Sequence, residues 1–170
     1  MNNAIVSNSL RFLGLFFVQV LILINVDINT TYVNLYIYPL FILLLPIRIQ
    51  KVVLLIIAFT IGLGIDMFYN TTGVNAAAAV LTAYLRSTVL EAIKPKGGYE
   101  QNHVPTKHQF GTGWFLRYAG ILFFIHLFVV FFLEKLSFSD FGGFLLKTIL
   151  SYLLSMILVI IYMFLFNPKR

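Results

Sequence analysis

One aspartate, one arginine and one histidine stand well inside long apolar stretches, where each could do chemistry: Asp66, Arg86 and His126. A carboxylate within a membrane can relay protons or bind a cation. We expect such a site to hold further acidic residues at the depth of Asp66, and the sequence offers none. His126 lacks a second ligand nearby, and a single imidazole is a poor metal site. A structural hydrogen bond from His126, with Ser155 at a similar depth, is therefore favoured, and a proton relay or cation site at Asp66 is the alternative.

Other catalytic arrangements are not indicated by the sequence. The chain has no cysteine, which excludes disulfides, thiolate metal sites and cysteine nucleophiles. No Ser/His/Asp set, phosphate-binding glycine loop or pair of carboxylates stands at suitable positions. We therefore expect a protein that is not an enzyme and that carries neither a cofactor nor a metal.

The composition is that of a membrane protein. Of the 170 residues, 60% are hydrophobic and 11% are charged, whereas a soluble domain carries about 25% charged residues. The net charge of +6 could indicate nucleic-acid binding in a soluble protein. Here we interpret the basic residues as topology signals beside membrane spans, with no nucleic-acid partner. The sequence predicts one integral membrane domain over residues 1–170, surrounded by membrane lipid.

Six apolar runs predict an all-α bundle of six transmembrane helices. A helix of about 20 residues crosses a hydrocarbon core of about 30 Å. The run 32–47 is short and contains Pro39 and Pro46, so it is a kinked span or a re-entrant segment. Residues 94–113 form the one long polar stretch, and we expect a mobile loop there. The predicted helices cover residues 10–26, 32–47, 52–68, 75–93, 114–133 and 149–166.

The basic residues also predict the orientation of the bundle. Positive charges collect on the cytoplasmic side of membrane proteins. With both termini in the cytoplasm, two lysines outside the runs, Lys135 and Lys147, fall on the opposite side. The cytoplasmic set is then Arg11, Arg48, Lys51, Lys94, Lys96, Lys107, Arg117, Lys169 and Arg170.

Asp66 stands where the third run turns into the fourth, which suggests a capping role. Asn75 is the predicted N-cap of the fourth helix, after the turn at Gly73. The free N–H groups at a helix N-terminus attract a carboxylate, so we expect Asp66 to lock this hairpin. Gly62 and Gly64 would let the fourth helix pack closely against the third.

The fourth run is only marginally apolar, because Arg86 costs about 2.5–3.5 kcal/mol near a helix centre. We therefore expect this helix to lie inside the bundle. Ala79 and Ala83 form part of a small-residue stripe suited to close helix packing, and Arg86 projects within about 20° of Ala79. We predict a polar layer of Arg86, Gln19 and Thr60. The alternative is that Arg86 extends to the cytoplasmic surface.

The third and fourth runs resemble the signature hairpin of the MreD family, the bacterial rod shape-determining membrane proteins. The matching residues are Gly62-Leu63-Gly64-Ile65-Asp66, then Gly73-Val74-Asn75-Ala76, then the pair Tyr84-Leu85. The resemblance is sharp over this hairpin and general elsewhere, and the long 94–113 loop departs from the family's compact members.

The resemblance implies a function and a location. Proteins of this family are non-enzymatic, multi-pass scaffolds in the bacterial cytoplasmic (inner) membrane. They support rod shape and peptidoglycan synthesis by binding MreC, in a larger complex with RodA, a penicillin-binding transpeptidase and MreB filaments. Their fold is similar to the substrate-binding subunits of energy-coupling-factor transporters. The alternative is therefore a vitamin-type small-molecule binding subunit, with a polar pocket near the outer face lined by Asp66, Asn70, Asn75 and Asn29.

Overall fold

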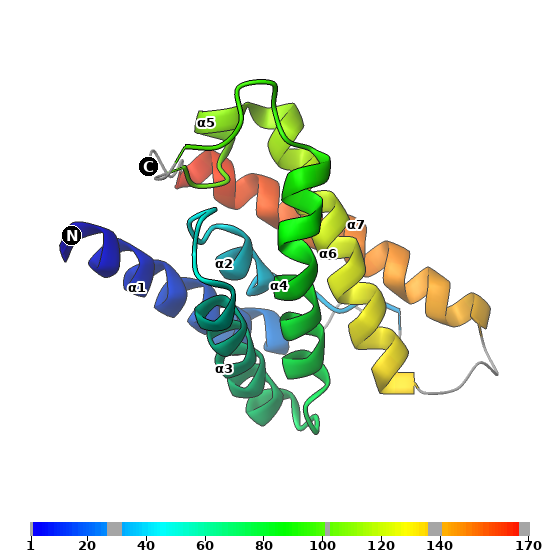
Figure 1. The fold of residues 1–170 in the computed structure, drawn as a ribbon. Helices are drawn as coiled ribbons and strands as arrows, with labels where there is room; N and C mark the ends of the chain where they lie inside the picture. Colours follow the sequence, from blue (N-terminus) through cyan, green and yellow to red (C-terminus); the bar gives the residue numbers. More distant parts are fainter. Residues whose placement is uncertain (1, 27–31, 101–102, 136–140, 167–170) are drawn as a thin grey trace.

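The computed structural model describes residues 2–26, 32–100, 103–135 and 141–166, and all the regular secondary structure among them is helical, with no strand (Figure 1). Two irregular helical segments, η1 and η2, continue α1. The elements are α1 (Asn2–Phe17), the π-helical η1 (Val18–Ile22), the 3₁₀ segment η2 (Leu23–Asn25), α2 (Pro39–Leu43), α3 (Lys51–Tyr69), α4 (Val74–Ala92), α5 (Lys107–Phe110), α6 (Thr112–Lys135) and α7 (Phe141–Leu165).

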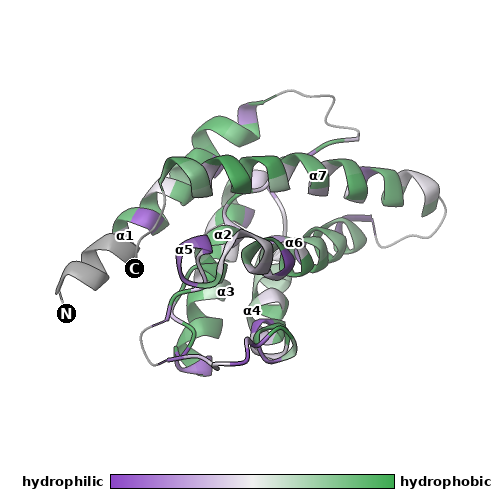
Figure 2. Ribbon diagram, turned by 90° about the horizontal axis from the view of Figure 1, so that it is seen from above, coloured by the Kyte–Doolittle hydropathy of each residue, from purple (hydrophilic) through white to green (hydrophobic). Residues whose placement is uncertain are grey.

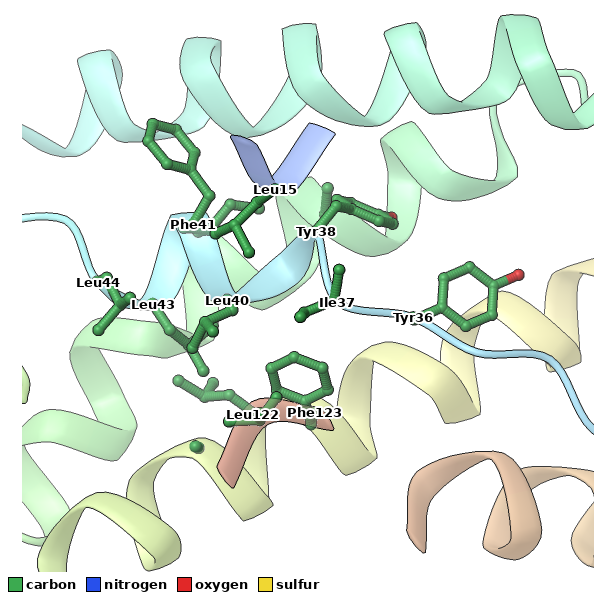
Figure 3. Close-up of a cluster of buried hydrophobic side chains, with 14 of the residues drawn as sticks. Leu15, Tyr36, Ile37, Tyr38, Leu40, Phe41, Leu43, Leu44, Leu122 and Phe123 are labelled. Atoms are coloured by element: carbon green, nitrogen blue, oxygen red, sulfur yellow. The ribbon is translucent and has the colours of Figure 1, made fainter. Parts of the chain in front are cut away.

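The helices pack around α2. Helices α3 and α4 form a hairpin, α4 packs on α6, and α6 packs on α7, while α2 contacts α1, α3, α4 and α6. All five residues of α2 are buried. Figure 3 shows their side chains meeting Leu15 of α1 and Leu122 and Phe123 of α6. The centre of the bundle is thus filled by α2, which belongs to the run 32–47 that contains the two prolines.

Among the described residues, three helices are long and apolar enough to cross a membrane: Lys51–Tyr69, Thr112–Lys135 and Phe141–Phe166. A shorter apolar helical stretch runs from Ser9 to Asn25. The outward faces of these helices are apolar, and Figure 2 shows hydrophobic colouring along most of the helical ribbon. On α7, for example, Leu153, Ile157 and Ile161 are exposed. A membrane bundle therefore fits the structure, and the six spans remain a prediction.

The helix predicted over 32–47 is wrong in its extent. Residues 33–37 are extended, and only Pro39–Leu43 form an α-helix. Proline is well suited to a first helical turn, because its missing N–H has no partner there, and Pro46 excludes a longer helix. The segment nevertheless traverses the bundle. Tyr36 stacks on Tyr69 at one end, and the N–H of Ile47 donates to the carbonyl of His103 at the other.

The described parts of the polar stretch, residues 94–100 and 103–113, pack against the bundle. Tyr99, Phe110 and Trp114 form an aromatic cluster, with ring centroids 4.4 Å apart for Phe110 and Trp114. The indole of Trp114 donates to the carbonyl of Ile93 (2.9 Å), and the Tyr99 hydroxyl donates to that of Leu90 (2.8 Å). We call this the loop end of the bundle, and the α3–α4 turn the hairpin end.

Candidate functional site

Asp66 binds the start of α4, as the sequence predicted. Its carboxylate is 2% exposed. Oδ1 accepts from the backbone N–H of Asn75 (2.9 Å), from the Asn75 side-chain amide (3.1 Å) and from the Thr71 hydroxyl. Oδ2 accepts from the N–H of Ala76 (2.9 Å). The partial positive charge at the N-terminus of α4 compensates the buried carboxylate.

The predicted N-cap residue is wrong. Asn75 lies within the first turn of α4, and the N-cap position is Gly73, which has φ of 89° and offers no side-chain cap. Glycine suits this left-handed backbone because it has no Cβ. The missing cap is supplied by Asp66 from the neighbouring helix, which satisfies N–H groups that an uncapped helix leaves free.

The two glycines of α3 have different neighbours. A Cβ on Gly62 would lie 2.5 Å from the Cα of Ala76 and 2.7 Å from the carbonyl oxygen of Asn75. Gly62 therefore permits the close approach of α3 and α4, as expected. Gly64 does not face α4, because a Cβ there would meet the ring of Phe16 at 3.0 Å. Its predicted role in the hairpin is wrong, and it packs towards α1.

We predict that Gly62→Ala lowers the free energy of unfolding by about 1–3 kcal/mol, the usual cost of overpacking. The added methyl group meets backbone atoms, which cannot move aside without opening the hairpin. Gly64→Ala is the matched control, because the ring of Phe16 can turn away, and Gly14→Ala meets nothing within 4 Å. Detergent unfolding curves check the order, and equal losses for Gly62→Ala and Gly14→Ala would contradict it.

The polar network continues from Asn75 to His126. The Tyr38 hydroxyl lies 3.3 Å from Asn75 Oδ1 and 2.8 Å from His126 Nε2. His126 Nδ1 lies 3.0 Å from the Thr82 hydroxyl, which donates its one proton to the carbonyl of Ala78 (2.7 Å). The two ring nitrogens of His126 thus each contact a hydroxyl group, one from Tyr38 and one from Thr82. The imidazole thus joins α6, α4 and the chain before α2.

The predicted pairing of His126 with Ser155 is wrong, because Ser155 serves the extended residues. The N–H groups of Asn34 and Tyr36 donate to the hydroxyls of Ser151 (2.9 Å) and Ser155 (3.0 Å) on α7. Successive N–H groups of an extended chain point to opposite sides. Residues 34 and 36 therefore turn their donors to α7, and residue 37 turns its donor away.

Gln19 pairs with the other side of the extended segment. Its amide donates to the carbonyl of Leu35 (2.9 Å) and lies 2.5 Å from the Tyr69 hydroxyl, while its carbonyl accepts from the N–H of Ile37 (2.7 Å). The carboxamide of Gln19 thereby makes the two backbone hydrogen bonds that a neighbouring strand would otherwise make. Gln19 is fully buried and lies in the π-helical segment η1. Short π-helical segments are frequent at functional sites.

The predicted polar layer of Gln19, Thr60 and Arg86 does not form. Thr60 is exposed, and its hydroxyl donates to the carbonyl of Ile56 in its own helix. The three residues were predicted from their similar depth along the helices, but their side chains do not face one another. Gln19 and Arg86 each bind the central segment instead.

Arg86 is 1% exposed, so the alternative in which it extends to the surface is also wrong. Its Nε donates to the Tyr118 hydroxyl (2.8 Å). Nη2 donates to the carbonyls of Leu45 and Pro46, and Tyr118 donates to that of Leu43 (3.0 Å). Arg86 and Tyr118 thus satisfy the carbonyls that follow α2, where helices have free acceptors. Ala79 and Ala83 are buried beside Arg86 on α4, as the small-residue stripe predicted.

Together, these contacts hold the central segment, in which α2 is flanked by non-helical residues, inside an apolar bundle. Non-helical backbone at membrane depth requires partners from protein or water. Sequence reasoning missed Tyr38, Tyr118 and Ser151 as members of the network. The serines at positions 151 and 155, one helical turn apart in a very apolar run, were the available signal. Comparisons with protein-family models, with curated proteins and with solved structures find no match for this chain.

Proposed function

We propose that this chain is a non-enzymatic, multi-pass scaffold of the MreD type in the bacterial inner membrane. It would support rod shape and peptidoglycan synthesis by binding the transmembrane helix of MreC. RodA and its penicillin-binding transpeptidase would join the same complex. Its mechanism is helix packing: a rigid bundle presents a fixed apolar surface to the partner.

The α3–α4 hairpin carries this proposal. Several of the residues on which the family resemblance rests act together as one structural unit. Asp66 binds the backbone of Asn75 and Ala76, and Gly62 lies against the same two residues. Gly73 supplies the left-handed turn between the helices. A signature with this structural role fits a family whose members act by shape.

Rigidity at the centre supports the same function. Gln19, Arg86 and His126 each join the central segment to a different helix. A partner helix would therefore meet a surface that is already formed, which lowers the entropic cost of binding.

The alternative, a vitamin-type binding subunit of a transporter, gains less support. The polar atoms of Asp66 and Asn75 that would contact a ligand are bonded to each other. Asn70 ends α3 in the left-handed conformation, with φ of 53°. Asn29, the fourth residue of the predicted pocket, lies outside the described residues.

Purification of the tagged chain from its own host in mild detergent distinguishes the two functions. We expect mass spectrometry to recover MreC, RodA and the penicillin-binding protein. Recovery of an ATPase pair with a transmembrane coupling subunit would instead establish the transporter function. The chain tagged at the other terminus, treated identically, controls for interference by the tag.

A further inference from the structure

A cavity of about 440 Å³ opens at the loop end between α3 and α4 and is lined by two cationic side chains. Lys51, the first residue of α3, is exposed, and Arg86 reaches the cavity from the buried side. Neither forms an ion pair with a described residue. Glu91 also lines the cavity, but its carboxylate pairs with Lys94 at 3.3 Å. The cavity therefore carries positive charge without a partner in the described part of the chain.

The guanidinium of Arg86 leaves one nitrogen available there. Nε and Nη2 are used by Tyr118 and by the carbonyls of Leu45 and Pro46. Nη1 has no hydrogen-bond partner among the described residues. It is not one of the fully buried polar atoms that lack a partner, so part of its surface is accessible. A buried charge without a counter-ion is costly, and an arginine held in this way presents its remaining donors to an anion such as phosphate.

A second, apolar groove of about 550 Å³ borders this cavity and lies along the seam of α3 and α4. The two share Leu55 and Tyr84 as lining residues. The groove then passes Phe59 and Leu63, which stand on successive turns of α3, and Ala77 on α4. Figure 1 shows the two helices side by side along this seam. We call it the seam groove.

We propose that the loop-end cavity binds the phosphate of an anionic phospholipid while one acyl chain of that lipid lies in the seam groove. Arg86 Nη1 and Lys51 have no counter-ion among the described residues, so they can bind the phosphate of the headgroup. The groove beside the cavity is almost wholly apolar, so it can hold the acyl chain. The combination of a cationic cavity and an apolar groove along α3 and α4 fits an amphiphile better than it fits a soluble anion. This inference is independent of the scaffold function.

Native mass spectrometry of the full chain, released from detergent containing phosphatidylglycerol or phosphatidylcholine, tests the headgroup. We expect preferential retention of one phosphatidylglycerol molecule. Lys51→Gln should weaken that binding about fivefold, the factor for one lysine near an anionic lipid surface. Lys96→Gln is the matched control, because Lys96 is an exposed cation of the same end outside the cavity lining, and we expect less than a twofold change. Equal effects of the two variants would overturn the proposal.

Ala77→Phe tests the chain by filling the seam groove at an exposed position, where folding should be unaffected. We expect about fivefold or greater loss of phosphatidylglycerol, by exclusion of the acyl chain. Ala92→Phe, at an exposed residue of the same helix outside both linings, should leave binding unchanged. Equal binding by Ala77→Phe and Ala92→Phe would overturn the proposal. So would displacement of the lipid by millimolar inorganic phosphate, since the cavity would then bind a free anion.

Discussion

Asp66→Leu should lower the free energy of unfolding by about 3–5 kcal/mol, because it leaves buried donors without an acceptor. The N–H groups of Asn75 and Ala76 and the side chains of Asn75 and Thr71 all donate to this one carboxylate. No other side chain in the described part of the chain caps α4. The start of that helix, and the turn before it, should therefore loosen together. Unfolding in detergent, followed by circular dichroism, measures the loss.

Two variants control this experiment. His126→Leu removes side-chain hydrogen bonds to Tyr38 and Thr82, and a bond of this kind between membrane helices contributes about 0.6 kcal/mol on average. It should therefore destabilise the protein less than Asp66→Leu does. Asp66→Asn retains one carboxamide oxygen and should fall between the parent and Asp66→Leu. If Asp66→Leu and His126→Leu were both as stable as the parent, the capping role of Asp66 would be refuted.

Gln19→Leu should destabilise the bundle by about 2 kcal/mol or more at nearly constant side-chain volume. Leucine cannot bond the carbonyl of Leu35 or the N–H of Ile37, and each orphaned buried group costs about 1–3 kcal/mol. The extended segment would lose its partner on the α1 side and keep its bonds to Ser151 and Ser155. We expect local opening around residues 35–38, with faster amide hydrogen exchange there than in α6.

Thr60→Val is the matched control for Gln19→Leu. Both substitutions replace a polar residue of an apolar helix by an aliphatic one, and the sequence alone placed the two residues in one layer. Thr60 is exposed and bonds within its own helix, so its loss should change stability by no more than about 0.5 kcal/mol. Similar destabilisation by both variants would show that the central segment does not depend on Gln19.

The proposed scaffold function and the proposed lipid site can be tested separately. Lys51→Gln and Ala77→Phe alter the loop-end cavity and the seam groove without touching Asp66 or Gly62. Loss of lipid with retained co-purification of MreC would show that the two surfaces act independently. Retained lipid in these two variants would overturn the lipid proposal, whether or not MreC is recovered. Failure to recover MreC with the parent chain would instead overturn the scaffold function.

The sequence by itself determined the class of fold and most of the helices. Five apolar runs correspond to helical stretches of the structure, since each is too long for a typical strand and has the length of a helix. It also predicted the contact of Asp66 with the start of α4 and the close approach at Gly62. Both follow from local constraints, because the hairpin brings these residues together within a few turns of chain.

Only the tertiary structure decided what lies at the centre. Residues 32–47 could be a helix by composition, but Pro39 and Pro46 confine α2 to five residues. The extended backbone is stable because Gln19, Ser151 and Ser155, distant in sequence, supply its missing hydrogen bonds. Depth along a helix can be counted from the sequence, but the direction in which a side chain faces depends on how the helices pack. For that reason Arg86 donates to the carbonyls after α2. Thr60, which was predicted at a similar depth, faces outward.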